Sequence, residues 1–166
     1  MTPNAAAAPV AILMGSDSDY PVMKAAGEAL RQLDVPFTAA VISAHRTPRE
    51  MIDFAVSARS RGVRVIIAGA GGAAHLPGML AACTELPVIG VPVPMPHLHG
   101  PDALLSIVQM PRGVPVATVA IGNAWNAGIL AAQILAAGDP SPALLDRIAA
   151  YKEEMRQQVM AKTLPI

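Results

Sequence analysis

Five short apolar runs along this chain limit the folds that it can adopt. They cover residues 9–14, 37–42, 63–69, 87–93 and 115–121. Each run has the length of a β-strand, and several are apolar throughout instead of alternating with polar residues. Strands of this kind are buried on both faces, as in a parallel sheet that is covered by helices. The sequence therefore predicts a five-stranded parallel sheet.

The segments between the runs show the spacing of amphipathic helices, in which apolar residues return every three or four positions. The apolar faces comprise Val22, Ala26, Leu30 and Leu33 in the first segment and Met51, Ile52, Ala55 and Val56 in the second. Further helices are expected at 76–84, at 102–109 and at 124–137, the last ending at Gly138. This alternation predicts a three-layer, doubly wound α/β fold of the flavodoxin-like kind with right-handed crossovers.

The length of the chain favours one domain over residues 1–166, with a core at about 9–137. A last helix is expected at about 141–160, too long and too charged on one face for a sheet crossover, so we expect it to pack on a neighbouring subunit. Only 14% of the residues are charged, against about 25% in an average protein. The missing polar surface favours self-association.

Charge and cysteine content exclude several classes of function. Twelve basic and twelve acidic residues balance, so no net field attracts nucleic acid or an anionic membrane. Cys83 is the only cysteine, which excludes an internal disulfide and a paired-thiol zinc site and fits a reducing cytoplasm. The apolar stretch 5–14 is too short for a membrane span and lacks the basic start of a signal peptide.

Polar residues and glycines gather after the predicted strands, where ligands bind to doubly wound sheets. The loops are GSDSD (15–19), SAHRTP (43–48), GAGGAAH (69–75), PMPHLHG (94–100) and GNAWNAG (122–128), and they hold all four histidines of the chain. We therefore expect a small-molecule site at this edge of the sheet.

The first loop, GSDSD, offers serine hydroxyls and free backbone N–H groups for a phosphate and a carboxylate for ribose hydroxyls. A serine or aspartate turn that caps the following helix explains the same residues. The loop is not a P-loop, because no Gly-Lys-Ser/Thr follows it.

The second loop, SAHRTP, combines a phosphate donor with a proton carrier. Arg46 can bind a phosphate through two N–H groups, and the imidazole of His45 can give and take a proton. The alternative is a helix start, in which Ser43 or Thr47 caps a helix opened by Pro48. Beside a phosphate loop and a glycine-lined slot, however, the pair favours a nucleotide monophosphate site.

The glycine-rich loop matches the dinucleotide pattern G-x-G-x-x-A at Gly69, Gly71 and Ala74. The match is weak, because the loop follows the third strand and lacks the later acidic residue. Small residues here allow a flat ligand to approach the backbone, although a tight turn is the alternative. His97 and His99 lack a third metal ligand, and Cys83 lies in an apolar helix, which favours a core position over a nucleophile.

In these loops the chain resembles a known family, the small subunit of phosphoribosylaminoimidazole carboxylase, or PurE, of purine biosynthesis. The resemblance covers roughly residues 10–137. It is carried, in order, by MGSDSD, SAHRTP, IIAGAGGAAHLPGM, PVIGVPV and SIVQMPRGVPVATVAIG.

The resemblance implies the bacterial activity, an N5-carboxyaminoimidazole ribonucleotide (N5-CAIR) mutase that moves a carboxylate from the exocyclic nitrogen to ring carbon C4 without cofactor or metal. It implies that His45 is the general acid and base and that Ser16, Asp19 and Arg46 bind the nucleotide. Its further expected neighbours of the substrate are Ser18, Ser43, Gly71, Ala73 and His75. It also implies a cytoplasmic homo-octamer that is functionally coupled to the ATP-dependent N5-CAIR synthetase.

The chain departs from the family at two places. The loop 94–100 carries Pro96, His97 and His99 where the family commonly has a serine and a leucine-glycine pair, and Trp125 replaces a common glycine. Two other functions stay open: an aminoimidazole ribonucleotide (AIR) carboxylase that uses free CO2, and a nucleotide- or NAD-binding module without this chemistry.

Overall fold

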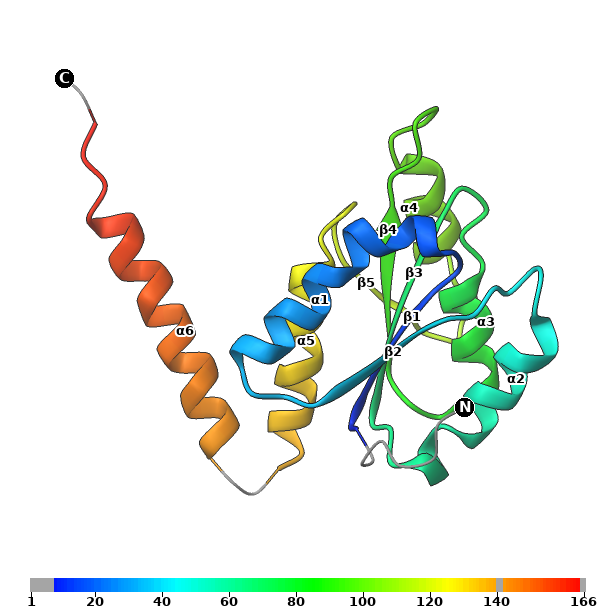
Figure 1. The fold of residues 1–166 in the computed structure, drawn as a ribbon, viewed down its shortest axis with the longest axis horizontal. Coiled ribbons are helices and arrows are strands. Elements are labelled where there is room, and N and C mark those ends of the chain that lie inside the picture. Colours follow the sequence, from blue (N-terminus) through cyan, green and yellow to red (C-terminus); the bar gives the residue numbers. More distant parts are fainter. Residues whose placement is uncertain (1–7, 140–141, 165–166) are drawn as a thin grey trace.

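A five-stranded, all-parallel sheet forms the centre of the computed structural model, which describes residues 8–139 and 142–164 (Figure 1). The strand order is β2-β1-β3-β4-β5, so the chain reverses direction across the sheet between β1 and β3. The strands are β1 (Val10–Met14), β2 (Phe37–Val41), β3 (Val65–Gly71), β4 (Val88–Val93) and β5 (Ala117–Thr118). The predicted flavodoxin-like order is confirmed.

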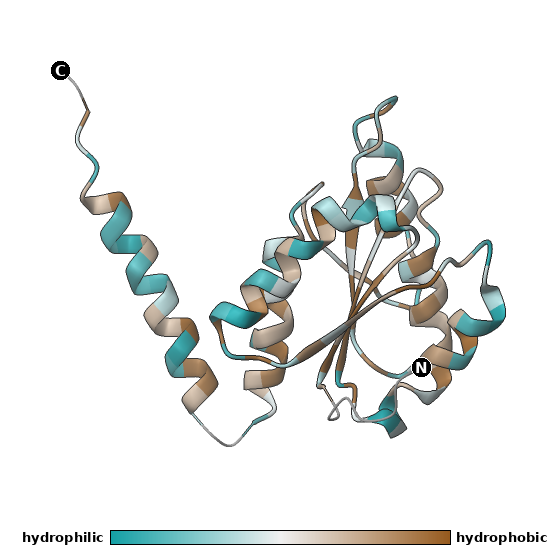
Figure 2. Ribbon diagram, in the orientation of Figure 1, coloured by the Kyte–Doolittle hydropathy of each residue, from teal (hydrophilic) through white to brown (hydrophobic). Residues whose placement is uncertain are grey.

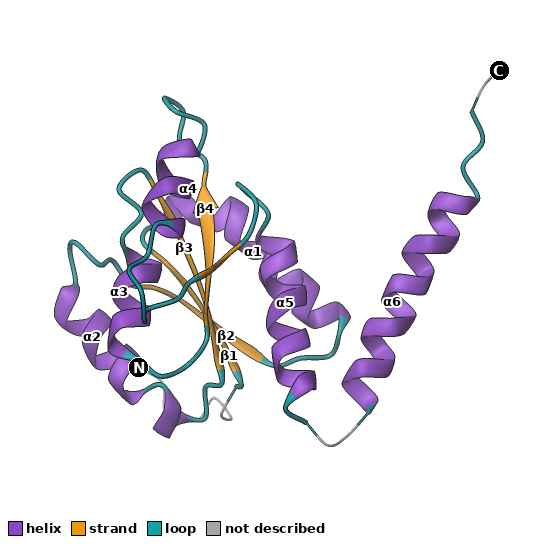
Figure 3. Cartoon of the chain, turned by 180° about the vertical axis from the view of Figure 1, so that it is seen from behind, coloured by secondary structure: helices purple, strands orange, loops and turns teal. Residues whose placement is uncertain are grey.

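Helices cover both faces of the sheet. They are α1 (Tyr20–Gln32), α2 (Pro48–Ser57), α3 (Leu76–Cys83), α4 (Pro101–Val108), α5 (Ala124–Ala137) and α6 (Ala143–Met160). Helices α1 and α5 lie on one face, and α2, α3 and α4 lie on the other, which Figure 3 shows from behind. None of the helices in the described ranges is both long and apolar enough to cross a membrane.

The apolar runs become strands because helices cover them from both sides. Ile12 and Ile67 face the core layer below α1 and α5, whereas Leu13 and Ile66 face the layer below α2, α3 and α4. All four side chains are at most 2% exposed. The hydropathy colouring in Figure 2 shows these central strands as largely apolar. Burial on both faces explains why the strand sequences do not alternate.

Helices α1 and α5 approach each other at Gly128. A Cβ atom on Gly128 would lie 2.6 Å from the carbonyl oxygen of Ala26 and 2.9 Å from the Cβ atom of Ala29. Any larger residue would therefore push the helices apart, and the missing side chain fixes their separation.

Helix α6 is held to this layer mainly by its first half. Leu144 and Ile148 are buried against it, and the Arg147 Nε atom donates a hydrogen bond of 2.8 Å to the carbonyl of Leu33. The indole N–H of Trp125 donates to the hydroxyl of Tyr151 at 3.0 Å. Trp125, which departs from the family pattern, thus links α5 to α6.

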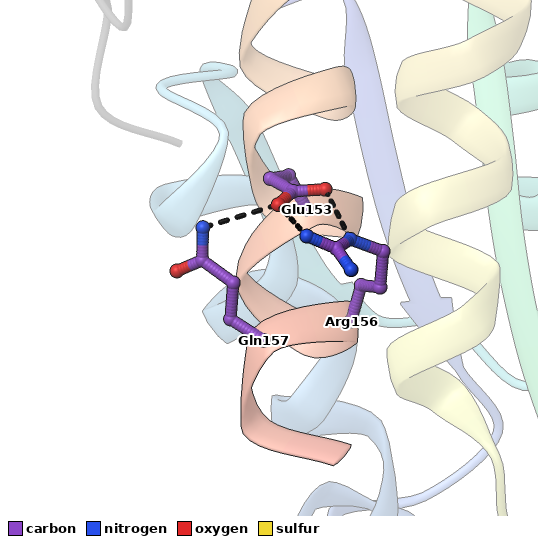
Figure 4. A network of polar contacts seen from close by, with 3 residues as sticks. All are labelled: Glu153, Arg156 and Gln157. Carbon is purple, nitrogen blue, oxygen red and sulfur yellow. Dashed lines mark hydrogen bonds and ion pairs between the residues drawn. The ribbon is translucent and has the colours of Figure 1, made fainter. Parts of the chain in front are cut away.

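The second half of α6 is exposed to solvent. Glu153 binds Arg156 at 2.7 Å and accepts a 3.1 Å hydrogen bond from Gln157 (Figure 4). Exposed pairs of this kind contribute little stability. Met155 and Val159 continue the stripe that begins with buried residues in the first half, but they are 39% and 62% exposed. The predicted start of this helix at 141 lies outside the described residues.

Two details differ from the sequence predictions. Strand β5 spans two residues instead of seven, and it pairs with β4 only through Ala117 and Thr118. Prolines explain this, because Pro115 and Pro92 of β4 cannot donate ladder hydrogen bonds. In α2 the buried face holds Met51 and Ala55, whereas Ile52 and Val56, expected on that face, are 43% and 68% exposed.

Candidate functional site

A cleft of about 420 Å³ opens at the carboxyl ends of β1 to β4, beside the reversal point of the sheet. It receives residues from four loops. Its lining consists of Gly15, Ser16, Ser18, Asp19, Ser43, Ala44, His45, Arg46, Ala70, Gly71, Ala73, His75, Leu76 and Met95. All nine residues predicted for the site are among them. Their chemical roles stay predictions.

The loop after β1 forms a short 3-10 helix, η1 (Asp17–Asp19), that leads into α1. The Ser16 hydroxyl accepts a hydrogen bond from the backbone N–H of Ser18 at 3.3 Å, and the Asp19 carboxylate accepts one from the N–H of Ser16 at 3.1 Å. This reciprocal pair is a capping box. The turn that the sequence offered as an alternative to a phosphate loop is therefore present, and its side chains still line the cleft.

Asp19 is the buried acid of the cleft, with only 5% of its surface exposed. Burial raises the pKa of its carboxyl above the ordinary value of 3.8, and this effect exceeds the lowering by backbone N–H groups of Ser16 and Gly15 and by the charge of Arg46. Additional hydrogen-bond donors would stabilise the charged form of this desolvated carboxyl. Sugar hydroxyl groups would supply them.

We expect Asp19→Asn to be more stable than wild type, and we expect this difference in stability to grow as the pH rises from about 4 to 7. The native carboxyl binds its proton more tightly than the unfolded one, so wild type loses stability as the pH rises from 3.8 through the raised native pKa. The amide of asparagine can still accept the Ser16 hydrogen bond, and it does not ionise. Thermal melts at several pH values measure the difference.

Exposed Asp53 on α2 provides the control, because Asp53→Asn also removes one carboxylate. A melting-point difference for Asp19→Asn that has the same pH dependence as the control would contradict the assignment.

The loop after β2 is closed by its own side chains. The hydroxyl of Thr47 accepts a hydrogen bond from the N–H of Ser43 and donates one to its carbonyl, both at 3.0 Å. The buried Ser43 hydroxyl accepts from the backbone N–H and Nε of Arg46 at 3.2 and 3.3 Å. Thr47 does precede α2, but its side chain does not cap the helix.

Arg46 connects the first two loops of the site. Its Nη2 atom donates a 2.8 Å hydrogen bond to the carbonyl of Gly15. With the Nε contact to Ser43, two of the five N–H donors of the guanidinium are engaged. The remaining donors are held at the exposed mouth of the cleft, where they can bind an anion.

Two histidines contact each other across the cleft. His45 Nε2 lies 2.8 Å from His75 Nδ1, and the rings meet edge to face with centroids 4.8 Å apart. Contact at this distance requires one proton between the two nitrogens. The sequence placed both residues in the site, but their separation of thirty positions gave no sign of a direct bond.

The floor of the cleft is apolar and closely packed. Ala44, Ala70 and Leu76 are buried there. Gly71 ends β3 below Met95, and a Cβ atom at this position would lie 2.8 Å from both Cγ and Sδ of Met95. The glycine predicted to allow close approach of a ligand therefore also makes room for a methionine.

Sequence reasoning missed five lining residues: Gly15, Ala44, Ala70, Leu76 and Met95. Four of them adjoin predicted site residues in sequence, whereas Met95 is the sole lining residue from loop 94–100. Loop 122–128 supplies no lining residue. Within the described ranges, no three histidine, cysteine, aspartate or glutamate residues are placed to hold a metal ion. Cys83 packs beside the core layer below α2, α3 and α4.

Comparison with known proteins identifies the family to which the chain is related. In sequence, the chain is 57% identical over 162 residues to N5-carboxyaminoimidazole ribonucleotide mutase of Mycobacterium tuberculosis, which covers 98% of this chain and 92% of that protein. It is 62% identical over 135 residues to phosphoribosylaminoimidazole carboxylase of Ogataea methanolica, covering 81% of this chain but 25% of that protein.

Solved structures and family profiles agree with the sequence relatives. The crystal structure of Treponema denticola PurE matches with a TM-score of 0.82 at 26% identity, covering 91% of this chain and 93% of that one. The profile of the AIR carboxylase family matches residues 9–158. Because the family profile and the M. tuberculosis relative each match most of its length, the chain belongs to the AIR carboxylase family.

Proposed function

We propose that this protein is an N5-CAIR mutase of purine biosynthesis, which converts N5-carboxyaminoimidazole ribonucleotide into 4-carboxy-5-aminoimidazole ribonucleotide. The observation that carries the proposal is the cleft, where a phosphate donor, a buried carboxylate and a histidine pair converge from separate loops. These groups match the parts of a ribonucleotide that carries an imidazole base.

The nucleotide binds by its phosphate and its sugar. Arg46 donates its free N–H groups to the phosphate, beside the hydroxyls of Ser16 and Ser18. Asp19 accepts hydrogen bonds from ribose hydroxyls, which add to the one from the Ser16 N–H and offset the desolvation of its carboxylate. The base then lies toward the glycine-rich loop, where the small side chain of Ala73 leaves room for a flat ring beside the methionine that covers Gly71.

His45 moves the proton in both halves of the reaction. It protonates the exocyclic nitrogen, so the N–C bond of the carbamate breaks and CO2 leaves. Ring carbon C4 attacks the CO2, and His45 takes the proton that C4 loses. His75 orients the imidazole through the 2.8 Å contact. Atoms and charge balance without a cofactor, since the carboxyl group only changes its position.

The extent of sequence matching favours the mutase over the carboxylase. The M. tuberculosis relative matches over 92% of its length and is named a mutase. The O. methanolica carboxylase is matched over only a quarter of its length, so its activity cannot be attributed to the matched segment alone. An NAD-binding module is disfavoured, because the G-x-G-x-x-A pattern follows β3 and lacks the acidic partner.

The experiment compares two starting materials by the absorbance of the C4-carboxylated product. We expect rapid product formation from N5-carboxylated nucleotide without added bicarbonate, and slow formation from the uncarboxylated nucleotide at ordinary CO2 concentration. The opposite preference would establish a carboxylase. If neither nucleotide gave product, the binding module would be the remaining alternative.

We extend the proposal to a homo-octamer in the cytoplasm, supplied with substrate by the ATP-dependent N5-CAIR synthetase. Association is supported by the exposed apolar stripe on α6 and by β2, where Val41 is 54% exposed. A second copy of the chain would bury both surfaces. We expect light scattering at micromolar concentration to give the mass of eight chains, and a monomeric mass would refute the assembly.

A further inference from the structure

Met95 occupies a position in the cleft that the proposed roles do not use. It lies two residues after β4 and lines the β4 end of the cleft, two strands away from the loop after β1. Its side chain is 40% exposed. It covers Gly71, at which a Cβ atom would lie 2.8 Å from Met95 Cγ and Sδ. The side chain thus spans the space between the ends of β3 and β4.

The backbone holds this methionine firmly. Pro94 and Pro96 fix their own φ angles, and a residue that precedes proline is restricted to extended conformations. The carbonyl of Met95 accepts a 2.9 Å hydrogen bond from the N–H of His99, which closes the loop on itself. The N–H of Gly122 donates at 2.9 Å to Pro92, just before the loop. These constraints fix the backbone at Met95 and therefore the direction in which its side chain leaves the chain.

The cleft that Met95 lines offers apolar surface to a gas molecule such as CO2. Ala44, Ala70 and Leu76 supply buried apolar surface in the same cleft. None of these three side chains can hydrate CO2 or react with it. The histidine pair lines the same cleft. An apolar thioether in this cleft limits the access of water to the CO2.

We propose that Met95 retains CO2 beside ring carbon C4 between its release and its recapture. This inference rests on the proposed mutase function. The carbamate N–C bond breaks, its carbon leaves as CO2, and the exocyclic nitrogen takes a proton from His45. Electrons of the ring enamine then form the C4–C bond, and the C4 proton passes to His45. Met95 takes no part in the bond changes and governs only how much CO2 escapes between them.

The test measures how the carboxyl carbon is divided between product and solution. Enzyme acts on N5-CAIR labelled with ¹⁴C in the carboxylate under a CO2-free gas stream, and label in the C4-carboxylated product is compared with trapped CO2. A blank without enzyme corrects for spontaneous loss from the carbamate. We expect Met95→Ala to raise the escaping fraction about threefold, because water and CO2 pass freely where the side chain is missing.

Two further variants separate a polar effect from an effect of size. Met95→Gln keeps the length of the side chain and adds a polar amide, so its escaping fraction should also rise. Met95→Leu keeps apolar volume and should retain label like wild type. Ile52 on α2 is similarly exposed, at 43%, and Ile52→Ala serves as the control outside the cleft.

A second measurement supplies unlabelled N5-CAIR together with ¹³C-bicarbonate. Product from wild type should stay nearly unlabelled, whereas product from Met95→Ala and Met95→Gln should take up the external carbon. A variant that reacts more slowly, but with an unchanged escaping fraction and without uptake of ¹³C, would overturn the role of Met95. This holds even if the variant is less stable than wild type. Failure of the mutase proposal is distinguishable, since wild type itself would then form no C4-carboxylated product.

Discussion

His45→Asn should lower turnover by about 100-fold or more, the usual scale for losing a general acid and base, while the nucleotide still binds. Asparagine is polar and similar in size, but its amide neither gives up nor takes up a proton near neutral pH. Arg46, Asp19 and the serines remain in place to hold the phosphate and the sugar. Steady-state rates with N5-CAIR and calorimetric titration with the C4-carboxylated product measure the two effects separately.

His75→Asn is the informative comparison for this variant. It removes the 2.8 Å partner of His45 but leaves the proposed proton carrier, so we expect a smaller loss of turnover than for His45→Asn. Full activity of His45→Asn would mean that the loop SAHRTP serves only as a phosphate loop and helix start. Loss of product binding in that variant would instead mean that His45 acts mainly in recognition.

Arg46→Ala should weaken nucleotide binding by about 10- to 100-fold, because a hydrogen bond between charged groups contributes about 1.5–3 kcal/mol. The loss should depend on the phosphate. Calorimetry can compare the C4-carboxylated ribonucleotide with its nucleoside, which lacks the phosphate. For the nucleoside we expect wild type and Arg46→Ala to bind alike.

Arg49 supplies the matched control, since it is an exposed arginine in the first turn of α2, three positions further along the chain. Arg49→Ala should leave both affinities unchanged. Equal losses for nucleotide and nucleoside in Arg46→Ala would show that the arginine only braces the loops through Gly15 and Ser43. Arg46→Lys should bind the nucleotide with intermediate affinity, because it keeps the charge and loses the planar fork.

Patterns of local sequence predicted the parts of the fold that depend on local sequence. Apolar runs and helical spacing gave the order of the elements and located the loops that build the cleft. The length of β5 could not be read in this way, because it depends on whether β4 offers a partner at each position and Pro92 does not. The exposure of Val56 depends on which side of α2 meets the sheet, and helical spacing alone left two adjacent faces possible.

For the site, the sequence identified residues but not their contacts. Nothing in the spacing of His45 and His75 indicates that they meet, since their proximity comes from β1 pairing with both β2 and β3. The sequence did not predict Met95 as a site residue, because a methionine beside prolines has no catalytic signature. Its importance arises from Gly71 on the neighbouring strand. The Trp125 contact with Tyr151 likewise joins segments whose relation only the folded chain reveals.

The close approach at Gly128 has a consequence for how substrate can enter. Helix α1 starts directly after Asp19, and its position is locked where the absent side chain of Gly128 meets the backbone of Ala26. The loop 15–19 thus lies between the buried strand β1 and helix α1, whose position this contact fixes. We therefore expect this half of the cleft to have its binding shape before the nucleotide arrives. A residue larger than glycine at position 128 would displace α1 and, with it, the loop 15–19 that precedes the helix.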